Sequence, residues 1–222
     1  MTNEDLQKLK TKLPTVPGIL GKNEYFNSAV LIPLIFINGE YNFLFEKRTL
    51  NIRQGGEICF PGGEYDKNND LSFLDTALRE TEEEIGIDKS KVTIIGALDT
   101  LVGSMGVTVD SFIATLKVTS LTEILYNQKE VEKVFLIPVS FFENNPPQKY
   151  FLRNEVNPIE KDKVGKEKYI LPVKELNLPN KYHKPWQGRK HKVFVYQTKE
   201  GIIWGITAKL VYEVTRLLKL KE

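Results

Sequence analysis

Three glutamates near the middle of the chain are spaced for joint chemistry. Glu80, Glu83 and Glu84 stand at positions i, i+3 and i+4, which would place three carboxylates on one face of a helix. Like charges at this spacing cost an isolated helix roughly 0.2–0.5 kcal/mol per pair, so we expect a compensating cation. Hard oxygen ligands without clustered thiolates or histidines favour Mg²⁺ or Mn²⁺ over zinc. The pattern predicts a divalent-cation site for phosphoryl transfer to water, and its alternative is solvated surface charge.

The helix that carries these glutamates is predicted over residues 72–85. Ser72 followed by Asp75 resembles the start of a capping box, and Gly86 supplies a stop. We expect an apolar stripe on the face opposite the glutamates, formed by Leu74, Leu78, Thr81 and Ile85.

The elements around this helix form a mixed pattern. Runs rich in β-branched and aromatic residues predict strands, the first two joined by a hairpin at Asn38-Gly39-Glu40. Expected strands cover residues 28–37, 41–48, 57–60, 92–98, 109–118 and 133–139, and an amphipathic helix covers 204–220. This order predicts a mixed sheet with helices, of the α+β or α/β class.

The length of 222 residues suits a single domain over residues 1–222. Residues 1–22 are expected to form an N-terminal arm, with a short helix followed by a loop rich in proline and glycine. A basic insert is predicted at 151–192, because residues 149–192 hold twelve Lys or Arg against five acids, a local charge of +7 that leaves −5 for the rest of the chain.

Composition excludes several classes of protein. A net charge of +2 argues against a dedicated nucleic-acid binder. Cys59 is the only cysteine, which excludes an intrachain disulfide and a zinc site of several thiolates. The longest apolar run, residues 29–37, is too short to cross a bilayer, so we expect a cytoplasmic protein without a membrane segment.

The run from Arg79 to Ile87, RETEEEIGI, preceded by Pro61-Gly62-Gly63, resembles the second half of the signature of the Nudix hydrolases. The resemblance implies a Nudix fold, in which a mixed β-sheet lies between helices. It also implies Mg²⁺ or Mn²⁺ as cofactor and catalytic roles for Arg79, Glu80 and Glu83. The implied metal ligands are Glu80, Glu83, Glu84 and the carbonyl of Gly63.

One position departs from the signature. The spacing from Gly63 to Arg79 is two residues longer than in the signature, and Asn69 stands where the family has a glutamate. Asp66 and Asp70 are the nearby acids, so the role of that carboxylate is either moved to Asp70 or absent.

The wider stretch over residues 48–87, RTLNIRQGGEICFPGGEYDKNNDLSFLDTALRETEEEIGI, is similar to the coenzyme A diphosphatase branch of the family. Further segments that resemble this branch are AVLIPL, Asn127 with Glu130-Val131 before VFLIPVSF, and IIWGITAKL. The resemblance implies hydrolysis of coenzyme A to 3′,5′-ADP and 4′-phosphopantetheine, although Gln54 replaces a histidine frequent in that branch and the insert matches no part of it.

Five further residues are candidates for substrate binding. Arg48 and Arg53 flank the glycine-rich core and could contact phosphates, and Glu130 is a candidate extra metal ligand or base. Lys184 and Arg189 of the basic insert could neutralise the 3′-phosphate of coenzyme A. The alternative for each is an ordinary solvated side chain.

Two other functions remain open. One is hydrolysis of another nucleoside diphosphate derivative, such as ADP-ribose, NADH or a capped RNA end, and the other is a nucleotide-sensing module without catalysis. We expect a small-molecule substrate rather than nucleic acid or membrane as partner. A homodimer is also compatible, since homodimers are common among Nudix proteins.

Overall fold

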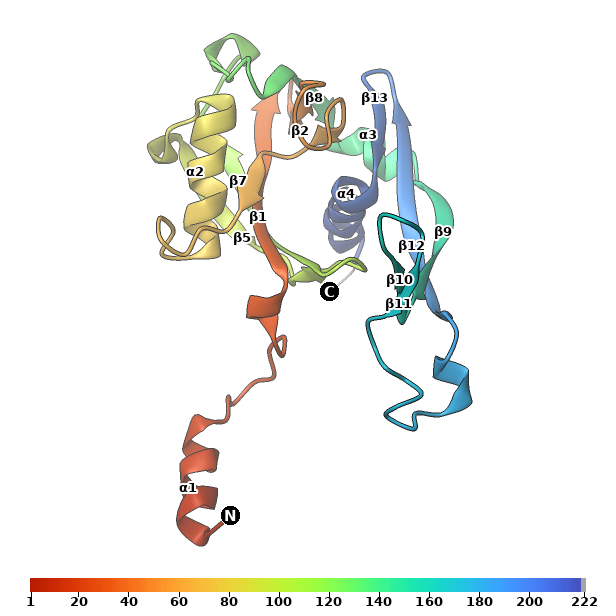
Figure 1. Ribbon diagram of the computed structural model, residues 1–222. Coiled ribbons are helices and arrows are strands. Elements are labelled where there is room, and N and C mark those ends of the chain that lie inside the picture. The colour runs from red at the N-terminus through yellow and green to blue at the C-terminus, as the bar shows by residue number, and fades with distance from the viewer. Residues whose placement is uncertain (221–222) are drawn as a thin grey trace.

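The structure is a computed structural model that describes residues 1–220. A mixed eight-stranded sheet forms its centre (Figure 1). The main path of the sheet runs β3-β2-β1-β7-β5, with β4 paired to β1, β6 to β7 and β8 to β2. Only β1 and β7 are parallel among its pairings in the described residues. The strands are β1 (Phe26–Ile37), β2 (Glu40–Arg48), β3 (Ile58–Cys59), β4 (Gly62–Glu64), β5 (Val92–Ala97), β6 (Leu101–Val102), β7 (Val107–Leu116) and β8 (Val131–Pro138).

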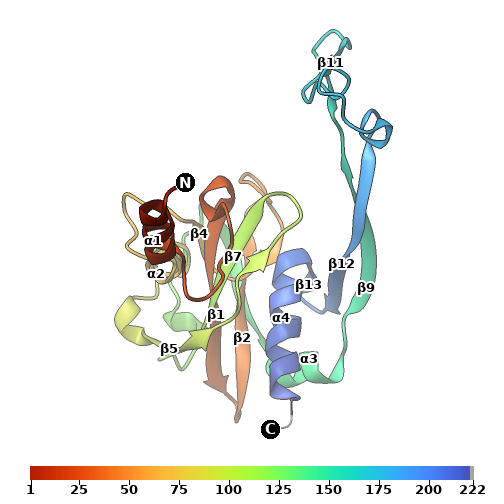
Figure 2. The same ribbon diagram turned by 90° about the horizontal axis from the view of Figure 1, so that it is seen from below.

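Helices cover both faces of this sheet, as the resemblance implied (Figures 1 and 2). Helix α2 (Phe73–Ile85) buries Ala77 and Ile85 against Leu31 and Leu44 of the sheet. Helices α3 (Val139–Asn144) and α4 (Gly205–Leu218) cover the other face. The core on that side contains Phe43, Phe45, Phe142, Leu210 and Val211.

A three-stranded sheet packs on the outer side of α4 and continues into a long ribbon. Its strands are β9 (Gln148–Val156), β12 (Trp186–Thr198) and β13 (Gly201–Trp204), and the hairpin of β10 (Ile159–Lys161) and β11 (Glu167–Tyr169) lies at the far end. The basic insert therefore contains an antiparallel ribbon, because β9 and β12 pair from Gln148 to Val156. In both views the end of this ribbon stands away from α2 (Figures 1 and 2).

The predicted N-terminal arm contains α1 (Asn3–Lys12), which is capped by Thr2 and buries none of its residues. Short 3₁₀ turns complete the fold at Lys22–Glu24, Lys89–Lys91, Leu121–Glu123 and Asn180–Tyr182. Within residues 1–220, no helix is both long and apolar enough to cross a membrane.

Candidate active site

A glycine pair links the sheet to α2. The backbone N–H of Gly62 donates to Oε2 of Glu84 at 2.8 Å. Any Cβ at Gly62 would lie 2.4 Å from the carbonyl oxygen of Ala29, and any Cβ at Gly63 would lie 2.4–2.6 Å from the carboxylate atoms of Glu80. Glycine is therefore required at both positions for the turn to meet two carboxylates of α2.

Glu84 points into the protein rather than to the solvent. Its side chain is 3% exposed, and Nη1 of Arg48 donates to its Oε1 at 3.2 Å. Burial, followed by the negative charge of Glu46, raises the pKa of Glu84 to about 8. The prediction that all three glutamates lie opposite the buried stripe was wrong for Glu84, because Gly62 and Arg48 provide its carboxylate with partners inside the fold.

The buried stripe of α2 also differs from the expected one. Thr76, Ala77, Thr81, Glu84 and Ile85 are buried, whereas Leu74 and Leu78 are only half-buried. Thr76 and Thr81 tolerate burial because their hydroxyls donate to Asp70 Oδ2 and to the carbonyl of Ala77.

Arg79 holds three carboxylates. Its Nε and Nη2 donate to the two oxygens of Asp70 at 2.9 and 3.0 Å. Its Nη1 donates to Glu80 at 2.6 Å and to Glu83 at 3.2 Å. Asp70 is only 4% exposed, and its hydrogen bonds from Arg79 lower its pKa to about 2. Of the two nearby acids in the loop, Asp70 is thus the one that pairs with the signature arginine.

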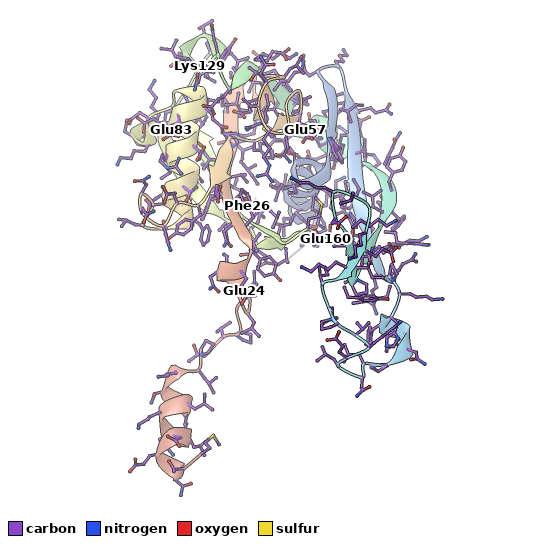
Figure 3. All side chains as sticks on the ribbon, in the orientation of Figure 1. Glu24, Phe26, Glu57, Glu83, Lys129 and Glu160 are labelled. Atoms are coloured by element: carbon purple, nitrogen blue, oxygen red, sulfur yellow. The ribbon has the colours of Figure 1, made fainter. Side chains whose placement is uncertain are left out.

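The other two signature glutamates line an open pocket. Burial raises the pKa of Glu80, while Glu83 is exposed on α2 (Figure 3). The pocket has a volume of about 450 Å³. It is lined by Glu64, Tyr65, Asp66, Asn69, Arg79, Glu80 and Glu83.

Glu46 of β2 was absent from the sequence-based set. It is fully buried, its Oε1 accepts from Sγ of Cys59 at 3.3 Å, and Nη1 of Arg48 lies 3.7 Å from the same oxygen. Burial above all, with a smaller contribution from the negative charges of Glu130 and Glu80, raises the pKa of Glu46 to about 7. An acid directly after the apolar run Phe43-Leu44-Phe45 was the signal that could have identified it.

The thiol of Cys59 packs between the strands and donates to Glu46. Burial and the neighbouring Glu46 raise its pKa well above the ordinary value, which keeps the sulfur protonated.

The five substrate candidates are distributed over two regions. Arg48 lies between Glu46 and Glu84, and Glu130 accepts from Asn127 at 3.2 Å and adds negative charge near Glu80. The guanidinium of Arg53 lies 5.0 Å from the ring centre of Phe26. Lys184 and Arg189 are exposed in the ribbon region, on which Figure 3 also marks Glu160, and the end of that ribbon stands apart from α2.

The donor set fits a hard divalent cation. Within residues 1–220, no three His, Cys, Asp or Glu side chains converge as a ready metal cage. Arg79 Nη1 instead contacts both Glu80 and Glu83, and Arg48 Nη1 lies beside Glu84 and Glu46. The absence of a Cβ at Gly63 leaves room for the Glu80 carboxylate, and all the candidate donors are oxygens, which is the set that Mg²⁺ and Mn²⁺ accept.

Comparison with known proteins places the chain in a family. The NUDIX domain model matches residues 26–187. The uncharacterized Nudix hydrolase NudL of Photorhabdus laumondii is 27% identical over 217 residues, which cover 97% of this chain and 96% of that protein. Nudix hydrolase 3 of Caenorhabditis elegans is 30% identical over 206 residues, or 86% and 74% of the two chains.

Among solved structures, the NUDIX domain of Shewanella oneidensis NrtR complexed with ADP ribose is 16% identical, with a TM-score of 0.43 over 66% of this chain and 89% of that chain. The family assignment rests on the sequence matches, which span most of the chain. The chain belongs to the NUDIX domain family, and the relatives it matches over most of its length are Nudix hydrolases.

Proposed function

We propose that the chain is a metal-dependent hydrolase that cleaves the diphosphate bond of a nucleoside diphosphate derivative, with coenzyme A as the substrate. The observation that carries the proposal is the Arg79 network, in which one guanidinium holds Asp70, Glu80 and Glu83 beside the Gly62-Gly63 turn and an open pocket. A network of this kind orients carboxylates for a reaction, because each oxygen that Arg79 binds has a fixed direction.

Glu80, Glu83, Glu84 and the carbonyl of Gly63 would hold Mg²⁺ or Mn²⁺. When bound, the cation supplies charge neutralisation for the diphosphate and makes water a stronger nucleophile at neutral pH. Burial raises the pKa of both Glu80 and Glu84, and a bound cation would offset the cost of keeping these two carboxylates ionised.

The chain's own residues then have separate tasks in the hydrolysis. Glu80 or Glu83 accepts a proton from the attacking water, whose oxygen bonds to one phosphorus as the bridging phosphorus–oxygen bond breaks. The bridging oxygen leaves on the other phosphate, so coenzyme A and water yield 3′,5′-ADP and 4′-phosphopantetheine. Arg79 keeps Glu80 and Glu83 in place during this transfer.

The choice of coenzyme A rests on the resemblance of residues 48–87 to the coenzyme A diphosphatase branch. Arg48 ends β2, its Nε donates to the carbonyl of Arg53, and Glu130 lies in the neighbouring loop, where its carbonyl accepts from Thr49 N–H. We assign these three residues to the substrate side of the site. Lys184 and Arg189 are assigned to the 3′-phosphate. The end of the ribbon stands apart from α2 (Figures 1 and 2). Contact between this region and a substrate at α2 would therefore require the ribbon to bend, or a second copy of the chain to supply it.

The test is product identification after incubation with Mg²⁺ or Mn²⁺ and a panel of coenzyme A, dephospho-coenzyme A, ADP-ribose, NADH and a capped RNA. Release of 3′,5′-ADP from coenzyme A in preference to cleavage of the others is expected. Preference for another member keeps the hydrolase and discards coenzyme A. Absence of turnover with every member would contradict the enzyme and favour a nucleotide-sensing module.

A further inference from the structure

The candidate site contains more carboxylates than its cationic side chains can neutralise. Arg79 is shared by three acids, and Arg48 lies beside two. The acids of this cluster are Glu46, Asp70, Glu80, Glu83, Glu84 and Glu130. Glu46, Asp70 and Glu84 are buried, so water does not solvate their share of the negative charge.

Glu46 is the member of this cluster that the signature does not contain. It lies on β2 next to Phe45, which faces the aromatic core under α4. Leu44, two residues from Glu46 on the same face of the strand, packs in the core under α2. The Glu46 side chain therefore points to the α2 side of the sheet, where Glu84 and Glu80 lie.

The two oxygens of Glu46 differ in their partners. Oε1 accepts from the thiol of Cys59 and lies 3.7 Å from Arg48 Nη1. Oε2 is buried and has no hydrogen-bond partner among the described residues. A buried carboxylate oxygen without a donor is costly, and natural folds rarely keep one without a use.

Arg48 does not remove this cost. Its Nη1 lies closer to Glu84, at 3.2 Å, than to Glu46, so one positive charge faces two buried carboxylates. Cys59 offers only a weak thiol donor, and Cys59 already uses it on Oε1. Glu84, to which the metal has been assigned, is contacted by the same Arg48 Nη1.

We propose that Oε2 of Glu46 is a further ligand of the divalent cation, supplied by strand β2 from beneath α2. The inference rests on the proposed function, since it concerns the same cation. It adds a ligand from outside the glycine turn and the acidic helix, and it explains why a fully buried strand position carries an acid.

The experiment compares Glu46→Gln with the wild-type chain, using Mn²⁺ alone as the probe. Glutamine has nearly the same shape and can still accept from Cys59, but it removes the charge and weakens the ligand. An electron paramagnetic resonance titration should show Mn²⁺ binding at least about tenfold weaker in the variant. Without Mn²⁺ the variant should unfold at a temperature no lower than the wild type, because a buried uncompensated charge is gone.

Two companion variants separate the outcomes. Glu132→Gln removes the same charge from an exposed position of β8 that pairs with Lys47, and should leave Mn²⁺ affinity within about twofold. Glu84→Gln should weaken Mn²⁺ binding as Glu46→Gln does. If Glu84→Gln weakens binding and Glu46→Gln does not, the Glu46 ligand is overturned while the metal site stands. A wild-type chain that binds no Mn²⁺ would instead contradict the proposed function itself.

Discussion

Arg79 and Asp70 form a two-bond ion pair across nine positions of sequence, with Nε–Oδ1 at 2.9 Å and Nη2–Oδ2 at 3.0 Å. This pair uses one edge of the guanidinium, formed by Nε and Nη2, and leaves Nη1 to contact Glu80 and Glu83. A loop two residues longer than in the family signature thus still delivers an acid to the signature arginine, because the loop folds back through the Asp66–Asp70 turn.

The first prediction concerns Asp70→Asn. The variant keeps the shape of the side chain but loses the ion pair that fixes Arg79, so turnover should fall roughly 10–100-fold. Steady-state kinetics on the diphosphate that the wild type cleaves best would measure this. Asp88→Asn is the matched control, because Asp88 is exposed, accepts a hydrogen bond within residues 1–220 only from the N–H of Ser90, and should retain turnover within about threefold. Equal losses in the two variants would contradict the role of Asp70.

Stability should depend on pH through the same pair. The pKa of Asp70 is lowered from 3.8 to about 2 in the folded protein, so its contribution is fully present above 3.8 and is lost as pH falls towards 2. The loss should be on the order of 2 kcal/mol in the free energy of unfolding. Urea unfolding of the wild type and Asp70→Asn at about pH 6 and about pH 2.5 would measure it. The difference between the two proteins should shrink at the lower pH, and a constant difference would contradict the assignment.

Gly63→Ala should separate activity from folding. The added Cβ would meet the carboxylate of Glu80 at 2.4–2.6 Å, and the end of a flexible side chain can move aside at little cost in stability. Turnover should fall by about a hundredfold or more because Glu80 leaves its position. In Gly96→Ala the new Cβ has no neighbouring atom within 4 Å, so that variant should retain turnover. Comparable turnover for the two variants would show that the Gly63–Glu80 approach is not needed.

Glu83→Gln tests the exposed glutamate of the site. We expect turnover to fall by roughly two to three orders of magnitude with little change in the melting temperature, since Glu83 is 58% exposed. Glu82→Gln removes the same charge from the neighbouring position, which is exposed and makes no ion pair among the described residues, and should behave as the wild type. Near wild-type turnover for Glu83→Gln would remove Glu83 from the catalytic set.

The role of the ribbon is tested by the triple variant Lys184→Ala, Arg189→Ala and Lys190→Ala. If these side chains bind the 3′-phosphate, KM for coenzyme A should rise about tenfold or more, while KM for dephospho-coenzyme A changes by less than about threefold. Sedimentation at the assay concentration would show whether a second copy is present. Equal effects on the two substrates would discard the contact with the 3′-phosphate.

Local patterns accounted for most of the elements. The Ser72 cap and the Gly86 stop delimit α2 correctly, because capping depends on residues within one or two turns of the helix ends. The expected strands at 28–37, 41–48 and 133–139 also match β1, β2 and β8 within three residues at each end. The strands of the basic insert were not predicted. The pairing of β9 with β12 joins residues about forty positions apart, and composition alone does not indicate such pairing.

By itself, the sequence determined which residue types could bind a cation, since the spacing of Glu80, Glu83 and Glu84 and the glycine turn are local features. Only the tertiary structure decided their partners. It buried Glu84 against Arg48, selected Asp70 rather than Asp66 for Arg79, and brought Glu46 from β2 to the same cluster. The physical reason is that burial and ion pairing depend on which strands meet beneath the helix, and this is set by contacts between residues far apart in the chain.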